Sequence, residues 1–227
     1  MIADLEPIFK KYEAFVKQLD AVFETVRQQH PDCVKCELAC SDCCHALFDL
    51  SLIEALYINR HFLDNIGDHR RVDVLEDANR VDRKIYQLKR KAFKAVESGE
   101  KSEEQVLLEM AAERVRCPLL NQDEQCDLYA YRPITCRLYG IPTAIGGRGH
   151  TCGLSGFAEG QSYPTVNLDS VHAMLHELSQ EVIGLIQSTH VKMGDILMPL
   201  SMALLTVFDD NYLGLRSDTL KPEADQK

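Results

Sequence analysis

The sequence predicts a mainly α protein: an irregular helical domain organised around a cysteine-ligated metal centre, with a long amphipathic helix at its N-terminus. Apolar side chains recur at helical spacing through most of the 227 residues, and no segment shows a convincing strand alternation. The chain also holds nine cysteines, five of them within residues 33–44. Because a chain of this length can bury a sizeable core without cross-links, this density of thiols indicates metal or redox chemistry.

Residues 1–30 are predicted to form the long amphipathic helix, which ends before Pro31. Its apolar residues alternate at steps of three and four and therefore share one face: Leu5, Ile8, Tyr12, Phe15, Leu19, Val22 and Val26. Such a stripe could form a homodimer seam or bind a protein partner. Further aromatic and aliphatic residues widen the face, which favours packing on its own domain.

Two capping boxes predict further helices. Ser51 with Glu54 begins a helix that runs to about Phe62, and Ser102 with Gln105 begins one that ends near Val115. Between them, residues 68–96 repeat apolar side chains at helical spacing. The outer face of this third helix is basic, through Arg83, Lys84, Lys89, Arg90, Lys91 and Lys94. A solvated face is the usual meaning of such a patch.

The C-terminal half begins with an irregular segment. Residues 140–160 hold seven of the twelve glycines, so the backbone there can approach a bound group closely. Helical spacing returns over 170–186 and again over 199–208. We expect a single metal-binding helical domain over residues 1–216, with a cysteine-cluster core at 33–153 and flanking helices at 1–30 and 168–216. Residues 217–227 are predicted to form a flexible tail.

Composition excludes several classes of protein. The longest uncharged apolar run, 196–208, has thirteen residues, whereas a membrane span needs about twenty. The net charge of −10 argues against nucleic acid as a partner. The charged N-terminus does not have the pattern of a secretory signal, so we expect a cytoplasmic protein.

The cysteines fall into two sets of four. The first set is tight, with spacing C-x3-C-x2-C-C, and comprises Cys36, Cys40, Cys43 and Cys44. The second is spread over a longer segment and comprises Cys117, Cys126, Cys136 and Cys152. Short spacings let neighbouring thiolates converge on one centre, as in zinc and iron–sulfur sites. A disulfide framework is disfavoured, because the compartment is expected to be reducing and the total is odd.

Both halves of the cysteine pattern resemble a known family. The segments CELACSDCCHALFDLSLIEA and CPLLNQDEQCDLYAYRPITCRLYG, together with Cys152, are similar to the CxxCxxCC family, also called YkgJ-like, a zinc- or iron-chelating domain. The resemblance spans roughly residues 36–152. It implies that all eight cysteines of the two sets belong to the metal centre, whereas Cys33 lies outside the pattern.

Arg132 and Arg137 flank the third cysteine of the second set, and a centre of several thiolates needs nearby positive charge. We therefore expect both arginines beside the centre. Pro133 suits the first turn of a short helix whose N-terminal amides could face the centre. The alternative for the arginines is a surface ion pair with Asp123 or Asp127.

Histidines are weaker candidates. His172 and His176 lie four residues apart on one helix face, but with eight thiols available a surface role is favoured over metal ligation. His45 follows the Cys-Cys pair and His150 lies in the glycine-rich segment near Cys152. Either can orient a ligand from outside the first coordination sphere.

The leading hypothesis is a cytosolic metal-binding protein whose eight cysteines hold an iron–sulfur cluster, of the [4Fe-4S] type, or else Zn²⁺. Iron–sulfur is favoured because structural zinc sites tend to be compact paired knuckles, whereas here a tight set and a spread set are combined. The centre can be one multinuclear cluster or two adjacent four-thiolate sites.

Two alternatives stay open at this point. The first is a metal-dependent enzyme that modifies a protein or a small molecule. Some relatives of the family are linked to lysine methylation of flagellin, so the resemblance makes a methyltransferase-like role conceivable. The second is a structural zinc module that recruits a partner through the N-terminal helix or the basic helix face.

Overall fold

The computed structural model of the chain describes residues 4–37 and 40–215. Helices dominate these residues, which confirms the mainly α prediction. The α-helices are α1 (Glu6–Gln29), α2 (Leu52–Asn65), α3 (Asp68–Glu97), α4 (Glu103–Ala112), α5 (Ile134–Leu138), α6 (Leu168–Leu185) and α7 (Leu200–Leu205). Short 3₁₀ helices are η1 (Asp42–His45), η2 (Tyr129–Tyr131) and η3 (Val191–Asp195). The predicted flexible tail lies outside the described residues.

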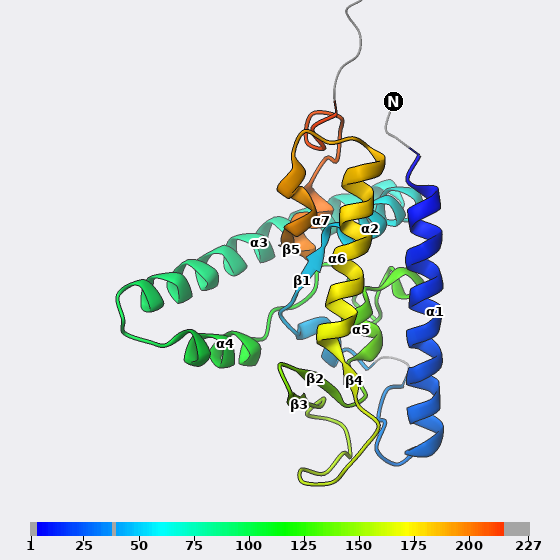
Figure 1. Cartoon of the computed structure of the whole chain (residues 1–227), viewed down its shortest axis with the longest axis vertical. Helices are drawn as coiled ribbons and strands as arrows, with labels where there is room; N and C mark the ends of the chain where they lie inside the picture. Colours follow the sequence, from blue (N-terminus) through cyan, green and yellow to red (C-terminus); the bar gives the residue numbers. More distant parts are fainter. Residues whose placement is uncertain (1–3, 38–39, 216–227) are drawn as a thin grey trace, which may run out of the picture.

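The long N-terminal helix α1 packs on its own domain. It runs beside α6 along the long axis of the molecule, and it also contacts α5 (Figure 1). Its predicted apolar face is largely buried, because residues three and four apart line up toward the core. Tyr12 is almost fully buried and packs on Tyr57 of α2, with ring centroids 4.9 Å apart.

The second helix, α2, lies at the centre of the core. Ser51 and Glu54 form the predicted capping box, in which each side chain meets the other residue's backbone amide. Ile53, Ile58 and Phe62 are almost inaccessible to solvent. Helix α2 contacts α1, α6 and α7, so these elements share one hydrophobic core.

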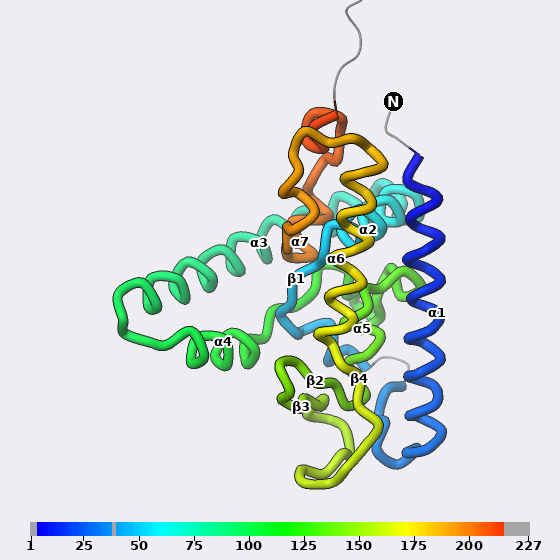
Figure 2. The backbone as a smooth tube through the Cα atoms, in the orientation of Figure 1, coloured from blue at the N-terminus to red at the C-terminus, as the bar shows by residue number. Residues whose placement is uncertain are grey.

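Helices α3 and α4 form a hairpin that projects from the body of the molecule; we call it the arm (Figures 1 and 2). The buried residues of α3 are Val74, Ala78 and Ile85, and α4 has none. The predicted capping box at the start of α4 is present, and Ser102 Oγ accepts a bond from the Gln105 amide at 3.2 Å. Helix α4 ends at Ala112, earlier than predicted, because the backbone of Val115 pairs with His45.

The structure also contains short strands, which no alternation in the sequence had indicated. Strand β1 (Asp49–Ser51) pairs antiparallel with β5 (Leu197–Pro199). Strand β2 (Thr143–Ile145) pairs antiparallel with β3 (Arg148–His150) and parallel with β4 (Val166–Asn167). Each has only two or three residues, too few to show alternation in the sequence. Gly146 and Gly147 make the β2–β3 turn with φ of 55° and 76°, the left-handed backbone that a tight hairpin requires.

Among the helices of the described residues, none combines the length and apolarity that a membrane span requires. The uncharged run at 196–208 instead forms β5, the short helix α7 and the segment after it. Met198 and Leu204 from this run are buried in the core.

Candidate metal centre

The two cysteine sets meet through backbone pairing. The amide of Cys117 donates to the carbonyl of Cys44 at 2.7 Å, and the amide of Val115 donates to His45 at 2.9 Å. Ala46 and Arg114 form the adjoining antiparallel bridge. The chain after the arm therefore lies directly along the segment that follows the first cysteine set.

Cys126 is positioned by a tight loop. Leu120 and Cys126 form an antiparallel bridge, and the Asn121 side chain accepts bonds from the amides of Asp123 and Gln125. At the tip of the loop, Glu124 adopts a left-handed φ of 56°. Its carboxylate accepts a bond from Ser41 Oγ at 2.7 Å, which joins this loop to the first cysteine set.

Cys136 lies on the short helix α5, which is anchored to α2. The amide of Ile134 at the start of α5 donates to Glu54 Oε1 at 3.0 Å, and Glu54 is only 4% exposed. We expected the N-terminal amides of this helix to face the centre. The structure corrects that expectation for Ile134, because its amide is bound by Glu54, and Pro133 is the N-cap residue rather than part of the first turn.

Cys36 and Cys152 are also part of the group of thiols, and each is positioned by contacts with a distant segment. A Cβ atom on Gly140 would overlap the Cys36 sulfur, so only glycine leaves room for that thiol. The Cys152 sulfur accepts a bond from the Leu154 amide at 3.4 Å and donates to Asp42 Oδ2 at 3.4 Å. Cys33 makes a different contact, since its carbonyl accepts from the Gly156 amide at 2.8 Å.

The thiols line two adjoining cavities. The inner compartment, about 50 Å³, is lined by Cys43, Cys44, Cys117, Cys126 and Cys136. The outer compartment, about 360 Å³, is lined by Cys36, Cys40, Cys43, Cys136 and Cys152. Two cysteines, Cys43 and Cys136, and Arg132 line both. All eight predicted ligands are thus gathered around two spaces with a common wall.

Burial and mutual repulsion set the protonation of these thiols without metal. Burial, and then the neighbouring thiols, raise the pKa of Cys117 to about 12 and that of Cys36 to about 11. Hydrogen bonds from Cys136 and Cys44 lower the pKa of Cys43, and the same bonds raise the pKa values of those two donors. One thiolate is therefore stabilised at the common wall, while its neighbours hold their protons until a cation displaces them.

All nine cysteines are free thiols, and each lies within the described residues. No three histidine, cysteine, aspartate or glutamate side chains of the described ranges are arranged to enclose a single metal ion. The donor set nevertheless suits zinc or iron in kind, because soft thiolates select these metals.

The two predicted arginines have different surroundings. Arg132 stacks on the Tyr129 ring at 3.9 Å from its centroid and helps to lower the pKa of Cys43. Arg137 is 8% exposed, and its guanidinium bonds Asp20 Oδ2 at 2.8 Å and two backbone carbonyls. Arg132 lies on the wall of both compartments, and Arg137 lies on the wall of the outer one, where its hydrogen bonds also hold α1 against α5.

The alternative ion pairs are not formed by these arginines. Asp127 pairs with Arg70 of α3 at 2.7 Å and accepts a further bond from Asn121. The alternative in which Asp127 binds Arg132 or Arg137 is wrong, because Asp127 forms its ion pair with Arg70 of α3. This ion pair also ties the loop that carries Cys126 to the base of the arm.

The histidines lie outside the group of thiols. His176 bonds Asp195 at 2.8 Å, and both it and His172 line a separate cavity of about 490 Å³. His45 contacts the carbonyl of Ser41 through Nδ1 at 3.0 Å, which places it on the turn that holds the first set. His150 is exposed on β3.

Three residues near the outer compartment were not foreseen from the sequence. Asp42 faces Cys152, Arg114 bonds both the backbone and the carboxylate of Asp42, and Tyr139 accepts from Arg114 at 3.1 Å. The position of Asp42 inside the C-x2-C step was the available signal. Its partners come from distant segments, so only the fold identifies them.

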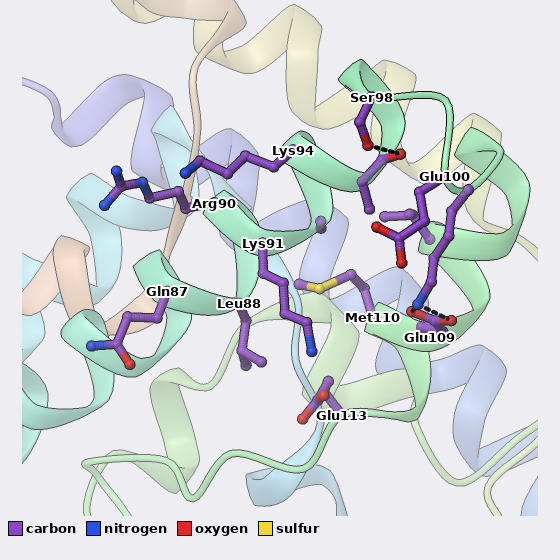
Figure 3. A pocket seen from close by; sticks show the side chains of 14 residues that line it. Gln87, Leu88, Arg90, Lys91, Lys94, Ser98, Glu100, Glu109, Met110 and Glu113 are labelled. Atoms are coloured by element: carbon purple, nitrogen blue, oxygen red, sulfur yellow. Dashed lines mark hydrogen bonds and ion pairs between the residues drawn. The ribbon is translucent and has the colours of Figure 1, made fainter.

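The arm holds a cavity of its own, about 570 Å³, which no cysteine lines (Figure 3). Its lining residues include Lys91 and Lys94 of α3, Glu109 of α4 and Glu113, the C-cap residue of α4. Of the predicted basic residues, Lys89 pairs with Asp49 at 2.7 Å and so ties the arm to β1. This cavity is separate from the thiols.

Comparison with known proteins identifies a family for this chain. The model of the CxxCxxCC family, described as "Putative zinc- or iron-chelating domain", matches residues 32–153, which include both cysteine sets. No curated protein and no solved structure is similar enough to match. Since the family match covers more than half of the chain and all the thiols of the two compartments, the chain belongs to the CxxCxxCC family of zinc- or iron-chelating domains.

Proposed function

We propose that the protein holds an iron–sulfur centre through eight cysteines: Cys36, Cys40, Cys43, Cys44, Cys117, Cys126, Cys136 and Cys152. The observation that supports this most is the pair of adjoining compartments, whose walls contain these eight thiols and share Cys43 and Cys136. The centre is accordingly one multinuclear cluster or two linked sites. In this proposal the protein is located in the cytoplasm, whose reducing conditions keep its nine cysteines as free thiols.

The distribution of thiols favours a cluster over mononuclear zinc. A structural zinc site brings four ligands to one ion in tetrahedral geometry. In this chain the eight thiols surround two adjoining spaces that share two of the cysteines. Thiolates around a cluster need to enclose a body larger than an ion, which suits the outer compartment of about 360 Å³.

The surroundings also suit an anionic cluster. Arg132 lines both compartments and brings positive charge to the shared wall. The Leu154 amide donates to the Cys152 sulfur, the kind of contact that tunes the reduction potential of iron–sulfur centres. In this proposal the bound group would supply redox or Lewis-acid chemistry, while the protein excludes water from the inner side and leaves the outer side accessible.

The experiment is a quantitative analysis of protein purified anaerobically. We expect a brown protein that contains iron and acid-labile sulfide and bleaches when oxidised. Colourless protein with stoichiometric zinc would overturn the iron–sulfur assignment and favour the structural zinc module. If a double Cys43→Ser, Cys136→Ser variant keeps the full metal content, the proposal that these two cysteines hold metal on the wall common to both compartments is overturned.

A further inference from the structure

Asp42 lies within the first cysteine set and contacts Cys152, one of the cysteines that line the outer compartment. It begins η1, the 3₁₀ turn that also carries Cys43 and Cys44. Its Oδ2 atom is 3.4 Å from the Cys152 sulfur, although the two residues lie on distant segments of the chain. On the proposed metal-binding function, we infer that the Asp42 carboxylate is an oxygen ligand of the metal in the outer compartment, beside Cys152.

The other carboxylate oxygen of Asp42 is held in place. Oδ1 accepts a short bond from Arg114 Nη2, which also bonds the Asp42 carbonyl at 3.0 Å. Arg114 in turn is fixed by its backbone bridge to Ala46 and by the Tyr139 hydroxyl. This arrangement leaves Oδ2 directed at Cys152, in the way that outer partners orient ligating carboxylates.

The Cys152 thiol and the Asp42 carboxylate face each other directly, because the sulfur donates its hydrogen bond to Oδ2. Thiolate sulfur and carboxylate oxygen are both ligands of zinc and iron in proteins. A metal ion bound at this point would therefore meet one sulfur and one oxygen donor, from two distant segments of the chain.

The other acidic side chains near the outer compartment are engaged elsewhere or make no contact with a thiol. Asp20 binds Arg137, and Glu24 binds Arg27 and Gln28. Glu37 lines the compartment, but its side chain has no hydrogen bond or ion pair within the described residues. Among the described residues no carboxylate lines the inner compartment, whereas Asp42 contacts Cys152 of the outer one. The two compartments therefore differ in the carboxylates available to a metal.

This difference predicts unequal metal binding. Carboxylate is a harder ligand than thiolate, so a soft metal bound partly through oxygen is held less tightly. The outer compartment is also the larger of the two, and Cys36 on its wall is exposed to solvent. Metal in the outer compartment should therefore exchange first when a chelator is added.

The test uses ¹¹³Cd²⁺ as the probe, added to the full chain after metal removal under anaerobic, reducing conditions. We expect separate ¹¹³Cd NMR resonances for all-sulfur sites and, at lower chemical shift, for a site with an oxygen ligand. Asp42→Asn should remove the second resonance or shift it, and should weaken that site about 10- to 100-fold. Glu37→Gln is the matched control, because it removes a carboxylate of the same compartment, and it should leave both resonances unchanged.

Each outcome separates the inference from the proposed function. Wild-type protein that binds cadmium only through sulfur overturns the Asp42 ligand and leaves the thiol centre standing. Equal effects of Asp42→Asn and Glu37→Gln overturn it as well, since they indicate a general charge effect. Failure of the cysteines to bind any metal overturns the proposed function itself. Cadmium X-ray absorption of the wild type counts oxygen neighbours directly, so the test holds even if Asp42→Asn does not fold.

Discussion

The Cys117 amide donates a 2.7 Å hydrogen bond to the Cys44 carbonyl, although α2, α3 and α4 separate the two residues in the chain. This contact aligns the start of the second cysteine set with the end of the first. The backbone thus brings the two sets together before any metal binds. Metal binding should then strengthen a contact that the fold has already made.

Cys44→Ser and Cys33→Ser should have opposite results. Cys44 lines the inner compartment, whereas Cys33 lines neither compartment and contacts Gly156 through its carbonyl. We expect Cys44→Ser to lose metal and Cys33→Ser to keep the wild-type content. Metal analysis after anaerobic purification measures both, and full metal content in Cys44→Ser would contradict the eight-ligand proposal.

Gly140→Ala should displace Cys36. A methyl group at this position would overlap the Cys36 sulfur, and such overpacking costs about 1–3 kcal/mol. We expect weaker metal binding in the outer compartment, measured as faster release to a chelator. Gly149→Ala is the control, because a Cβ there meets no atom within 4 Å and its backbone is not left-handed. Similar release rates from the two variants would count against the role of Gly140.

Arg132→Met and Arg137→Met should separate electrostatics from folding. Arg132 lines both compartments, so its loss should weaken metal affinity about 10- to 100-fold with little change in the unfolding of the metal-free protein. Arg137 lines only the outer compartment and joins α1 to α5 through Asp20 and two backbone carbonyls, so its loss should lower the free energy of unfolding by about 1–3 kcal/mol. Competition titrations and urea denaturation distinguish the two; the reverse pattern would contradict these assignments.

Glu54 should give the stability a specific pH dependence. Burial raises its pKa in the folded protein above the usual value of 4.5, despite hydrogen bonds from Ile134 and Ser51. The folded state therefore binds this proton more tightly than the unfolded state. The stabilisation is complete below pH 4.5 and is lost as pH rises through the folded-state pKa.

Glu54→Gln removes this titration. The free energy of unfolding of the wild type, minus that of Glu54→Gln in the same metal state, should fall as pH rises above 4.5 and then level off. Urea denaturation at a series of pH values measures this difference. A difference that is constant with pH, or that grows with pH, would show that the carboxyl of Glu54 is not the buried acid described.

The long helices were predictable because helix-forming patterns involve residues that are close together in the sequence. The apolar face of α1 and the capping box of Ser51 and Glu54 depend on residues a few positions apart, and both were found where expected. The strands were missed because two or three residues carry no period. Their pairing depends on which segments the helices bring together.

The same distinction between local patterns and distant contacts applies to the candidate metal centre. Spacing alone indicated the two cysteine sets and the positive charge of Arg132 near them. The division into two compartments, the partner of Arg137 and the direction of Asp42 depend on contacts between distant segments. Asp127 illustrates the difference most simply, because its partner Arg70 belongs to a helix whose position no local pattern reveals.

Native mass spectrometry of the anaerobically purified chain tests the central claim most directly, because it weighs the bound group on the intact protein. The account predicts a mass excess equal to iron plus sulfide, which is absent from Cys44→Ser and from Cys136→Ser but present in Cys33→Ser. A mass excess that corresponds to zinc alone, or no excess in the wild type, would contradict an iron–sulfur centre held by these cysteines.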